Sequence, residues 1–390
     1  MSDDLASLRP ALGGAALCNP VGMARQTRGL AVSGKAARMR HSPYEGLDAR
    51  AYWRTGVAQA HIAQAPEMDL YRPKFKIRAS DRVFTAGSCF AQHIARNMRK
   101  WGMSVIDREP APLGLPPERY TDYGYGLYSA RHGNIYTTRQ FLQLTQEACG
   151  RFAPKNWIWE RDGRFFDALR PSVDPNGLES PDLVKRSRQT HLKKFRQALG
   201  EASLVVFTLG LTETWEDIES GTVFPTAPGT IAGRYDPDRI RFLNLTHNDV
   251  LQDFLETRRL IKRFNPSVRF LLTVSPVPLT ATASGRHVMV ASSYSKSVLR
   301  GVVGQLTDAY SDIDYFPSYE IITAPSARGF FYAPNMRDVL PEAVETVMKT
   351  FLAAHGDTIS QPENRECAAG SGQTSDDIRC EELLLEAFAQ

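Results

Sequence analysis

The sequence lacks the features that mark several specialised classes of protein. No apolar run among its 390 residues is long enough to span a membrane, and the first residues lack the basic and apolar regions of a secretory signal. It has no Cys-x-x-Cys, and its eight histidines never take a His-Glu-x-x-His spacing, so we expect neither a metal nor another cofactor. Its five cysteines are an odd number without close pairing, which favours free thiols and a cytoplasmic location.

The charge is also too small to indicate a nucleic-acid partner. The formal net charge is +4, and only the segment 24–40 is basic without any acid. We interpret 1–42 as a disordered, solvated basic tail, with weak attraction to an anionic surface as the alternative. The segment 43–356 is expected to form one α/β domain with insertions, and 357–390 a polar linker with a short C-terminal helix. Nothing in the sequence indicates an oligomeric state.

Apolar strand segments alternate with amphipathic helix segments along the central part of the chain. We predict strands at 82–86, 101–106, 203–210, 269–276 and 314–317, and helices at 90–98, 138–149, 181–199, 248–264, 294–306 and 341–354. A further segment, 157–171, resembles an inserted β-hairpin. Strands that alternate with helices predict a three-layer α/β/α sandwich around a mainly parallel sheet.

Ser88 lies where the first predicted strand turns into a helix. Amide N–H groups after such a turn, together with the helix dipole, are suited to hold an oxyanion during acyl transfer. The simpler interpretation of Ser88 is a helix N-cap. Cys89 is a competing nucleophile, although we expect its thiol to pack inward. Ligands of open parallel sheets bind beyond the carboxyl ends of the strands, where Gly210 is also expected.

The segment Gly87-Ser88-Cys89-Phe90-Ala91 resembles the motif from which the GSCFA family takes its name. Further segments resemble the same family, in order along 80–352: 133–137, 207–215, 273–278, 294–297 and 315–320. The resemblance implies an SGNH hydrolase-like fold with a flavodoxin-like strand order. It also implies a serine esterase or O-acyltransferase that acts on an acylated carbohydrate or cell-surface glycan, with Ser88 as the nucleophile.

The chain departs from the SGNH pattern at the third sequence block, where such enzymes have Gly-x-Asn-Asp. Here Gly210 is followed by Thr212 and Glu213, so the usual oxyanion-binding asparagine is missing. We expect the oxyanion to be held by the backbone N–H of Cys89 and the Gly210 region, with the Thr212 hydroxyl or the Asn134 amide as further donors. Glu213 either orients a histidine or a substrate hydroxyl, or is only an acidic residue at the start of a helix or an ion-pair partner.

A second departure concerns the general base. The Asp-x-x-His element of SGNH enzymes corresponds here to 335–338, Asn-Met-Arg-Asp, which has no histidine. We predict His287, on the connection after the fourth strand, as the base, and His132 as the second choice; a loop histidine bonded to backbone is the alternative interpretation of His287. Without any base, the chain is instead a catalytically degenerate protein that binds a glycan or a nucleotide sugar, or an interaction module that uses its tail, 357–390.

Two groups of side chains are candidates for substrate contact. Lys296 and Arg300 are one helical turn apart and are expected either to meet an anionic group of the substrate or to form a solvated basic face. An aromatic loop, 120–136, carries five tyrosines whose rings either stack on sugars or pack as an insertion.

Overall fold

The computed structural model describes residues 42–59, 61–356, 359 and 380–389. The predicted disordered tail and polar linker lie almost entirely outside these residues. From Asp48 onward the described residues form one compact unit, and those up to Leu47 cluster separately.

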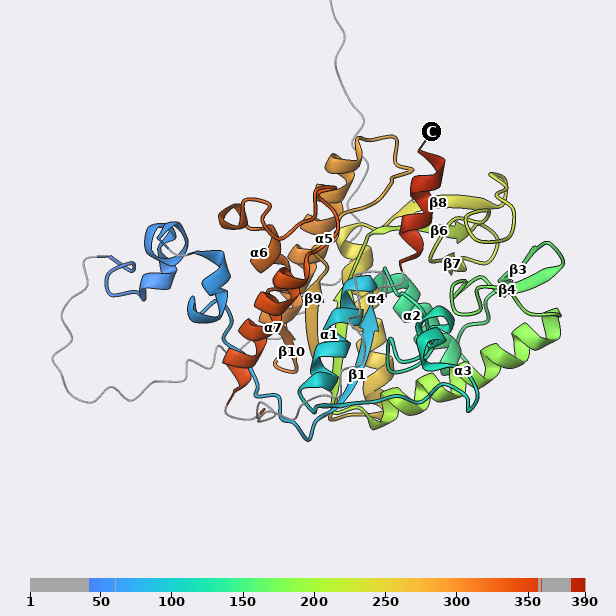
Figure 1. The fold of residues 1–390 in the computed structure, drawn as a ribbon, viewed down its shortest axis with the longest axis horizontal. Helices are drawn as coiled ribbons and strands as arrows, with labels where there is room; N and C mark the ends of the chain where they lie inside the picture. The colour runs from blue at the N-terminus through green and yellow to red at the C-terminus, as the bar shows by residue number, and fades with distance from the viewer. Residues whose placement is uncertain (1–41, 60, 357–358, 360–379, 390) are drawn as a thin grey trace, which may run out of the picture. The chain divides into compact units, whose positions relative to one another are not determined.

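A five-stranded parallel sheet forms the centre of this unit (Figure 1). Its strands, in spatial order, are β10 (Ile313–Tyr315), β9 (Arg269–Val274), β5 (Leu204–Leu209), β1 (Arg82–Gly87) and β2 (Ser104–Val105). All four neighbouring pairs are parallel. The order is flavodoxin-like, as predicted. The second strand, β2, lies on one side of β1, and the next strand of this sheet along the chain, β5, lies on the other side of β1. The point where the order reverses therefore lies between β1 and β5.

Helices cover both faces of the sheet, which confirms the predicted three-layer sandwich. The long helices are α1 (Cys89–Lys100), α2 (Thr138–Ala148), α3 (Pro181–Glu201), α4 (His247–Phe264), α5 (Val288–Ala309) and α7 (Pro341–His355), and α6 (Ser318–Thr323) is short. Alternate residues of a strand point to opposite faces. Accordingly Phe84 and Phe207 pack with α2, α3, α4 and α5, whereas Val83 and Val206 pack with α1, α6 and α7.

Smaller elements extend the sandwich beyond the central sheet. A hairpin pairs β3 (Ile158–Arg161) with β4 (Arg164–Asp167), and a second, antiparallel sheet has the order β7 (Val223–Phe224), β6 (Glu213–Asp217), β8 (Ile240–Asn244). The short helices are η1 (Ala49–Ala51), η2 (Arg54–Ala58), η3 (Ile62–Glu67), η4 (Pro117–Arg119), η5 (Thr121–Tyr123), η6 (Pro325–Ala327) and η8 (Glu381–Phe388). The antiparallel sheet is absent from the sequence-based expectation, because its strands are only two to five residues long.

Candidate active site

The turn between β1 and α1 is built for close approach of two strand ends. Gly87 has a φ of +140°, and a Cβ atom on it would lie 2.8 Å from the Cβ of Thr208 on β5. Only glycine fits such a position without strain. The next residue, Ser88, donates its N–H to the Thr208 carbonyl at 3.2 Å and precedes the first turn of α1.

The Ser88 hydroxyl is buried and makes no hydrogen bond. The residue is 3% exposed, and its Oγ has no partner among the described residues. Ser88 occupies the N-cap position of α1, as the simpler interpretation had it, but its side chain makes no capping hydrogen bond. An orphaned buried hydroxyl is rare in folded proteins and calls for an explanation such as a reactive role. The first N–H groups of α1, from Cys89 and Phe90, have no acceptor within the helix and carry the positive end of its dipole.

Gly210 directly follows β5. Its lack of a side chain leaves room for Ser88, and its N–H group is not available to an oxyanion. Its N–H donates to the Tyr136 carbonyl at 3.1 Å, so the predicted oxyanion contact from this group is wrong. A Cβ atom at position 210 would lie 2.9 Å from the Cβ of Ser88. The glycine thus lets the end of β5 approach the serine turn.

Lys296 reaches this turn from α5, whereas Arg300 does not. The Lys296 Nζ donates to the Gly210 carbonyl at 2.7 Å in a fully buried position. Burial lowers the pKa of Lys296 to about 8, and the nearby Glu382 and Cys89 act in the opposite direction. Arg300 instead pairs with Glu320. The predicted shared basic face is therefore wrong, because one cation is buried in the site and the other is engaged outside it.

Asn134 is buried near the serine turn, and its part in holding an oxyanion stays a prediction. Its Oδ1 accepts from Tyr128 OH at 2.5 Å and from Gln92 Nε2 at 3.0 Å, which leaves its Nδ2 directed at Tyr136 OH, 3.2 Å away. The Tyr128 hydroxyl also lies 3.0 Å from the carbonyl oxygen of Ser88. Both tyrosines are almost fully buried, so neither offers a free face to a sugar ring.

Among the described residues, neither predicted histidine forms a hydrogen bond with the Ser88 hydroxyl. His287 is exposed at the start of α5, where its Nδ1 accepts from the Met289 N–H at 3.2 Å. His132 is buried, with ring nitrogens 2.7 Å from the Gly133 carbonyl and 3.4 Å from the Thr85 carbonyl. Burial lowers the pKa of His132 to about 4. Both ring nitrogens of His132 and the Nδ1 of His287 thus face backbone groups, and the described hydrogen bonds do not support either histidine as the base of Ser88.

The side chains of Thr212 and Glu213 form hydrogen bonds with neighbouring segments and not with Ser88. The Thr212 hydroxyl donates to Asn244 Oδ1 at 2.7 Å, so it is not the oxyanion donor that we predicted. Glu213 begins β6 and accepts from Thr282 Oγ1 at 2.7 Å, and burial raises its pKa. This bond holds the connection between β9 and α5. No hydrogen bond described for the Glu213 carboxylate involves a histidine.

The stretch that replaces the SGNH histidine element places a cation in the site. Asn335 and Asp338 bond to each other at 2.8 Å near the surface, whereas Arg337 is 8% exposed and points inward. Its guanidinium lies 3.9 Å from Cys380 Sγ and 3.6 Å from Glu382. Sequence reasoning missed Arg337 because an arginine cannot replace a general base.

The C-terminal segment reaches the same residues through Cys380 and η8, the red helix next to the C mark in Figure 1. Glu381 and Glu382 are buried at its start. A hydrogen bond from Cys89, reinforced by Arg337, lowers the pKa of Cys380 to about 6, and the same bond raises that of Cys89. The sequence-based expectation is that the Cys89 thiol packs into the core. In the structure it is buried but faces Cys380 of the C-terminal segment.

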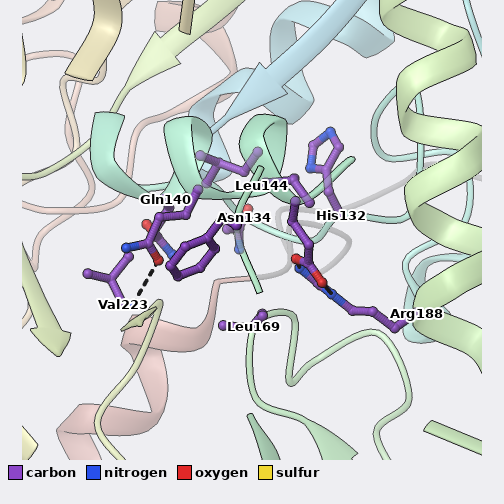
Figure 2. A pocket seen from close by; sticks show the side chains of 11 residues that line it. His132, Asn134, Gln140, Leu144, Leu169, Arg188 and Val223 are labelled. Atoms are coloured by element: carbon purple, nitrogen blue, oxygen red, sulfur yellow. Dashed lines mark hydrogen bonds and ion pairs between the residues drawn. The ribbon is translucent and has the colours of Figure 1, made fainter. Parts of the chain in front are cut away.

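A cavity beside the site is shown in Figure 2, with Gln140 and Leu144 on one wall and Leu169 on the opposite one. It also contains Arg188, whose guanidinium bonds to Glu147. Ser88 does not line it. A smaller cavity adjoins the Asn134 cluster and is lined in part by Tyr128 and by Ser172. Both cavities are lined in part by Asn134, and neither is lined by Ser88 or Lys296.

Two further observations concern the described residues as a whole. No helix among them is long and apolar enough to cross a membrane. Within the same residues, no three His, Cys, Asp or Glu side chains are grouped so that they could hold a metal ion.

Comparison with known proteins agrees with this architecture. The model of the GSCFA family matches residues 82–351, from the first residue of β1 into α7. A search of curated proteins gives no match. The matched range includes the serine turn, the end of β5, Lys296 and Arg337, and it covers most of the chain. The chain belongs to the GSCFA family.

Proposed function

We propose that the chain is an acyl-transfer enzyme, a serine esterase or O-acyltransferase that acts on acyl groups of a carbohydrate or cell-surface glycan. The observation that carries the proposal is the Ser88 hydroxyl, buried without a partner at the N-terminus of α1. It lies at the carboxyl end of β1, where the strand order reverses, which is the usual ligand site of open α/β sheets.

In this proposal Ser88 Oγ attacks the acyl carbonyl carbon and forms a tetrahedral oxyanion. The N–H groups of Cys89 and Phe90 hold that oxyanion, because they are free at the start of α1 and aligned with its dipole. Collapse of the intermediate breaks the ester bond, releases the sugar hydroxyl and leaves an acyl-serine. Water or another hydroxyl then takes the acyl group by the reverse sequence of steps.

We propose Lys296 as the general base in place of the predicted His287. Its amine is buried and donates to the carbonyl of Gly210, which packs against Ser88, and its pKa is lowered to about 8. About a tenth of the amine is then neutral at pH 7, and more at higher pH. A neutral amine accepts the Ser88 proton during attack and returns it to the leaving sugar oxygen. Serine–lysine pairs are an established variant of the serine–histidine arrangement.

The test is hydrolysis of p-nitrophenyl acetate together with covalent labelling by a fluorophosphonate. The Ser88→Ala variant is expected to lose labelling and to lower kcat by about 10³-fold or more, because the covalent step is removed. Ser293→Ala, on the exposed side of α5, is the matched control and keeps both activities. Equal labelling and turnover of Ser88→Ala and the wild type would rule the proposal out.

A second candidate function is binding of a glycan or nucleotide sugar without catalysis. It is favoured by one observation, that Arg337 points into the site from the stretch that carries the base in SGNH enzymes. Binding of an acetylated oligosaccharide that survives Ser88→Ala, with no turnover of any acyl donor, would favour this candidate. Turnover that depends on Ser88 would exclude it.

We also propose a reducing compartment such as the cytoplasm. The described cysteines Cys89, Cys149 and Cys380 are all free thiols, and two of them are in contact inside the site. Free thiols of this kind are typical of reducing compartments.

A further inference from the structure

The carboxylate of Glu381 occupies a set of three hydrogen-bond donors in the site. Tyr136 OH donates to its Oε2 at 2.6 Å, Asn134 Nδ2 donates to the same oxygen, and the Ser172 hydroxyl donates to Oε1. Glu381 itself is 4% exposed. Both oxygens of the carboxylate are therefore satisfied by neutral donors away from water. We refer to Asn134, Tyr136 and Ser172 as the carboxylate cradle.

The cradle is built by the core of the domain and not by the C-terminal segment. Asn134 is oriented by Tyr128 and Gln92, which hold its oxygen and turn its Nδ2 toward Glu381. The backbone N–H of Tyr136 donates to Gln140 Oε1 at 2.9 Å, within the first turn of α2. Since these contacts do not involve residues 380–389, the donors would stay in place when Glu381 leaves.

The cradle adjoins the serine turn on one side and two cations on the other. Tyr128 bridges Asn134 to the Ser88 carbonyl oxygen, at 2.5 and 3.0 Å respectively. Next to Glu381, Glu382 lies 3.6 Å from Arg337. Lys296 and Arg337 both stabilise the charged form of Glu382. Without the C-terminal segment, the site would thus present two buried cations beside three neutral donors, which suits an anionic ligand.

We propose that the carboxylate cradle is a substrate subsite for a carboxylate, and that Glu381 of the C-terminal segment is its internal competitor. The ligand is either the acid group of a sugar acid that carries the ester or the acid released from the acyl group. This proposal rests on the proposed function in one respect: it takes the ligand to be a substrate or product of the reaction at Ser88. Binding of a carboxylate to the cradle is independent of any catalysis.

Alkylation of Cys380 by iodoacetamide in the full chain reports whether the segment is seated. Cys380 is partly buried against Cys89 when Glu381 is bound, and it becomes accessible when the segment leaves. The tryptic peptide 380–390 contains this single cysteine, so mass spectrometry separates it from the other thiols. Glucuronate, acetate and the neutral sugar glucose serve as probes at equal millimolar concentrations.

We expect glucuronate or acetate to increase the Cys380 alkylation rate several-fold and glucose to leave it unchanged. A response to glucuronate alone assigns the cradle to a sugar acid, and a response to both assigns it to any small carboxylic acid. Glu381→Gln should raise the rate about tenfold without a ligand and abolish the response. Glu386→Gln makes the same change on the exposed side of η8 and should behave as the wild type.

The proposal fails if Glu381→Gln and Glu386→Gln alkylate at the same rate, or if neither carboxylate changes the rate in the wild type. Ser172→Ala is a second test of the proposal. It removes one donor of the carboxylate cradle and changes no residue of the C-terminal segment or of the serine turn. It should raise the unliganded rate and weaken the effect of the carboxylate. Ser88→Ala should respond as the wild type, so a loss of serine chemistry and a loss of the subsite are told apart.

Discussion

The backbone of Gly210 packs so closely against Ser88 that a Cβ atom at position 210 would lie 2.9 Å from the serine Cβ. This contact joins the ends of β5 and β1 at the reversal of strand order. Packing against the backbone of Gly210 therefore holds Ser88 in position, although no described residue forms a hydrogen bond with its hydroxyl.

Gly210→Ala should therefore damage both stability and activity. The added methyl group must displace the serine turn, and overpacking of this kind lowers the free energy of unfolding by about 1–3 kcal/mol. Gly200→Ala is the control, because a Cβ there meets only Phe264, at 4.0 Å, inside α3. It should raise the free energy of unfolding by about 0.5–1 kcal/mol. Urea denaturation and ester hydrolysis measure both effects; equal stability of the two variants would contradict the packing argument.

The activity should rise with pH through about 8 if Lys296 is the base. Its pKa is lowered to about 8 by burial, and only the neutral amine accepts the Ser88 proton, so kcat/KM increases as the amine deprotonates. Lys296→Met should lower kcat/KM by about 10²–10⁴-fold and remove this step from the pH profile. Lys349→Met, on the exposed face of α7, should keep the wild-type profile. An unchanged profile in Lys296→Met would assign the base elsewhere.

A buried ion-pair network next to the cavity in Figure 2 should dominate the stability of the α2–α3 region. Arg188 bonds Glu147 at 3.1 Å and lies 3.3 Å from Asp167, all nearly inaccessible to water. Arg188→Met leaves the buried Glu147 without its cation and Asp167 with Arg170 alone, and should lower the free energy of unfolding by about 3–5 kcal/mol. Removal of the exposed Lys349–Glu345 pair by Lys349→Met should change it by less than about 1 kcal/mol. Thermal unfolding of both variants measures the difference; a small shift for Arg188→Met would show that the network is dispensable.

His132 should make the protein less stable in acid. Its pKa is about 4 when folded, against an ordinary value of 6.5, because it is buried and stays neutral. Between these values the unfolded chain binds a proton that the folded chain does not, so stability falls as pH drops from 6.5 toward 4. Wild type should lose up to about 1.4 kcal/mol per pH unit more than His132→Gln over this range. The exposed His247→Gln should follow the wild type in urea denaturation at several pH values, and parallel slopes for His132→Gln would contradict the assignment.

The location of the serine turn could be predicted from the sequence because it depends on local rules. A short apolar run followed by Gly87 and Ser88 and then by apolar residues four apart specifies a strand, a tight turn and a helix. The alternation of such units specifies a parallel sheet. The three layers follow from the same pattern and the sheet order from the family resemblance, and the structure confirms both.

The partners of Ser88 could not be predicted in the same way. His287 and Thr212 were reasonable candidates by position along the chain, yet each side chain is used locally, by the Met289 N–H and by Asn244. Lys296 was expected either at an anionic group of the substrate or on a solvated basic face, and Arg337 only as part of the stretch that replaces the Asp-x-x-His element. Which side chains point into the site depends on helix rotation and on packing between distant elements.

The sequence by itself thus determined the sandwich, its parallel sheet and the serine at the carboxyl end of β1, because hydrophobic period and turn chemistry act over a few residues. Only the tertiary structure decided what surrounds that serine. Glu381 meets Asn134 and Tyr136 across about 245 residues of chain, and Arg337 meets Glu382 in the same site. Contacts of this range depend on how buried charges and donors satisfy one another in three dimensions, and no local pattern encodes them.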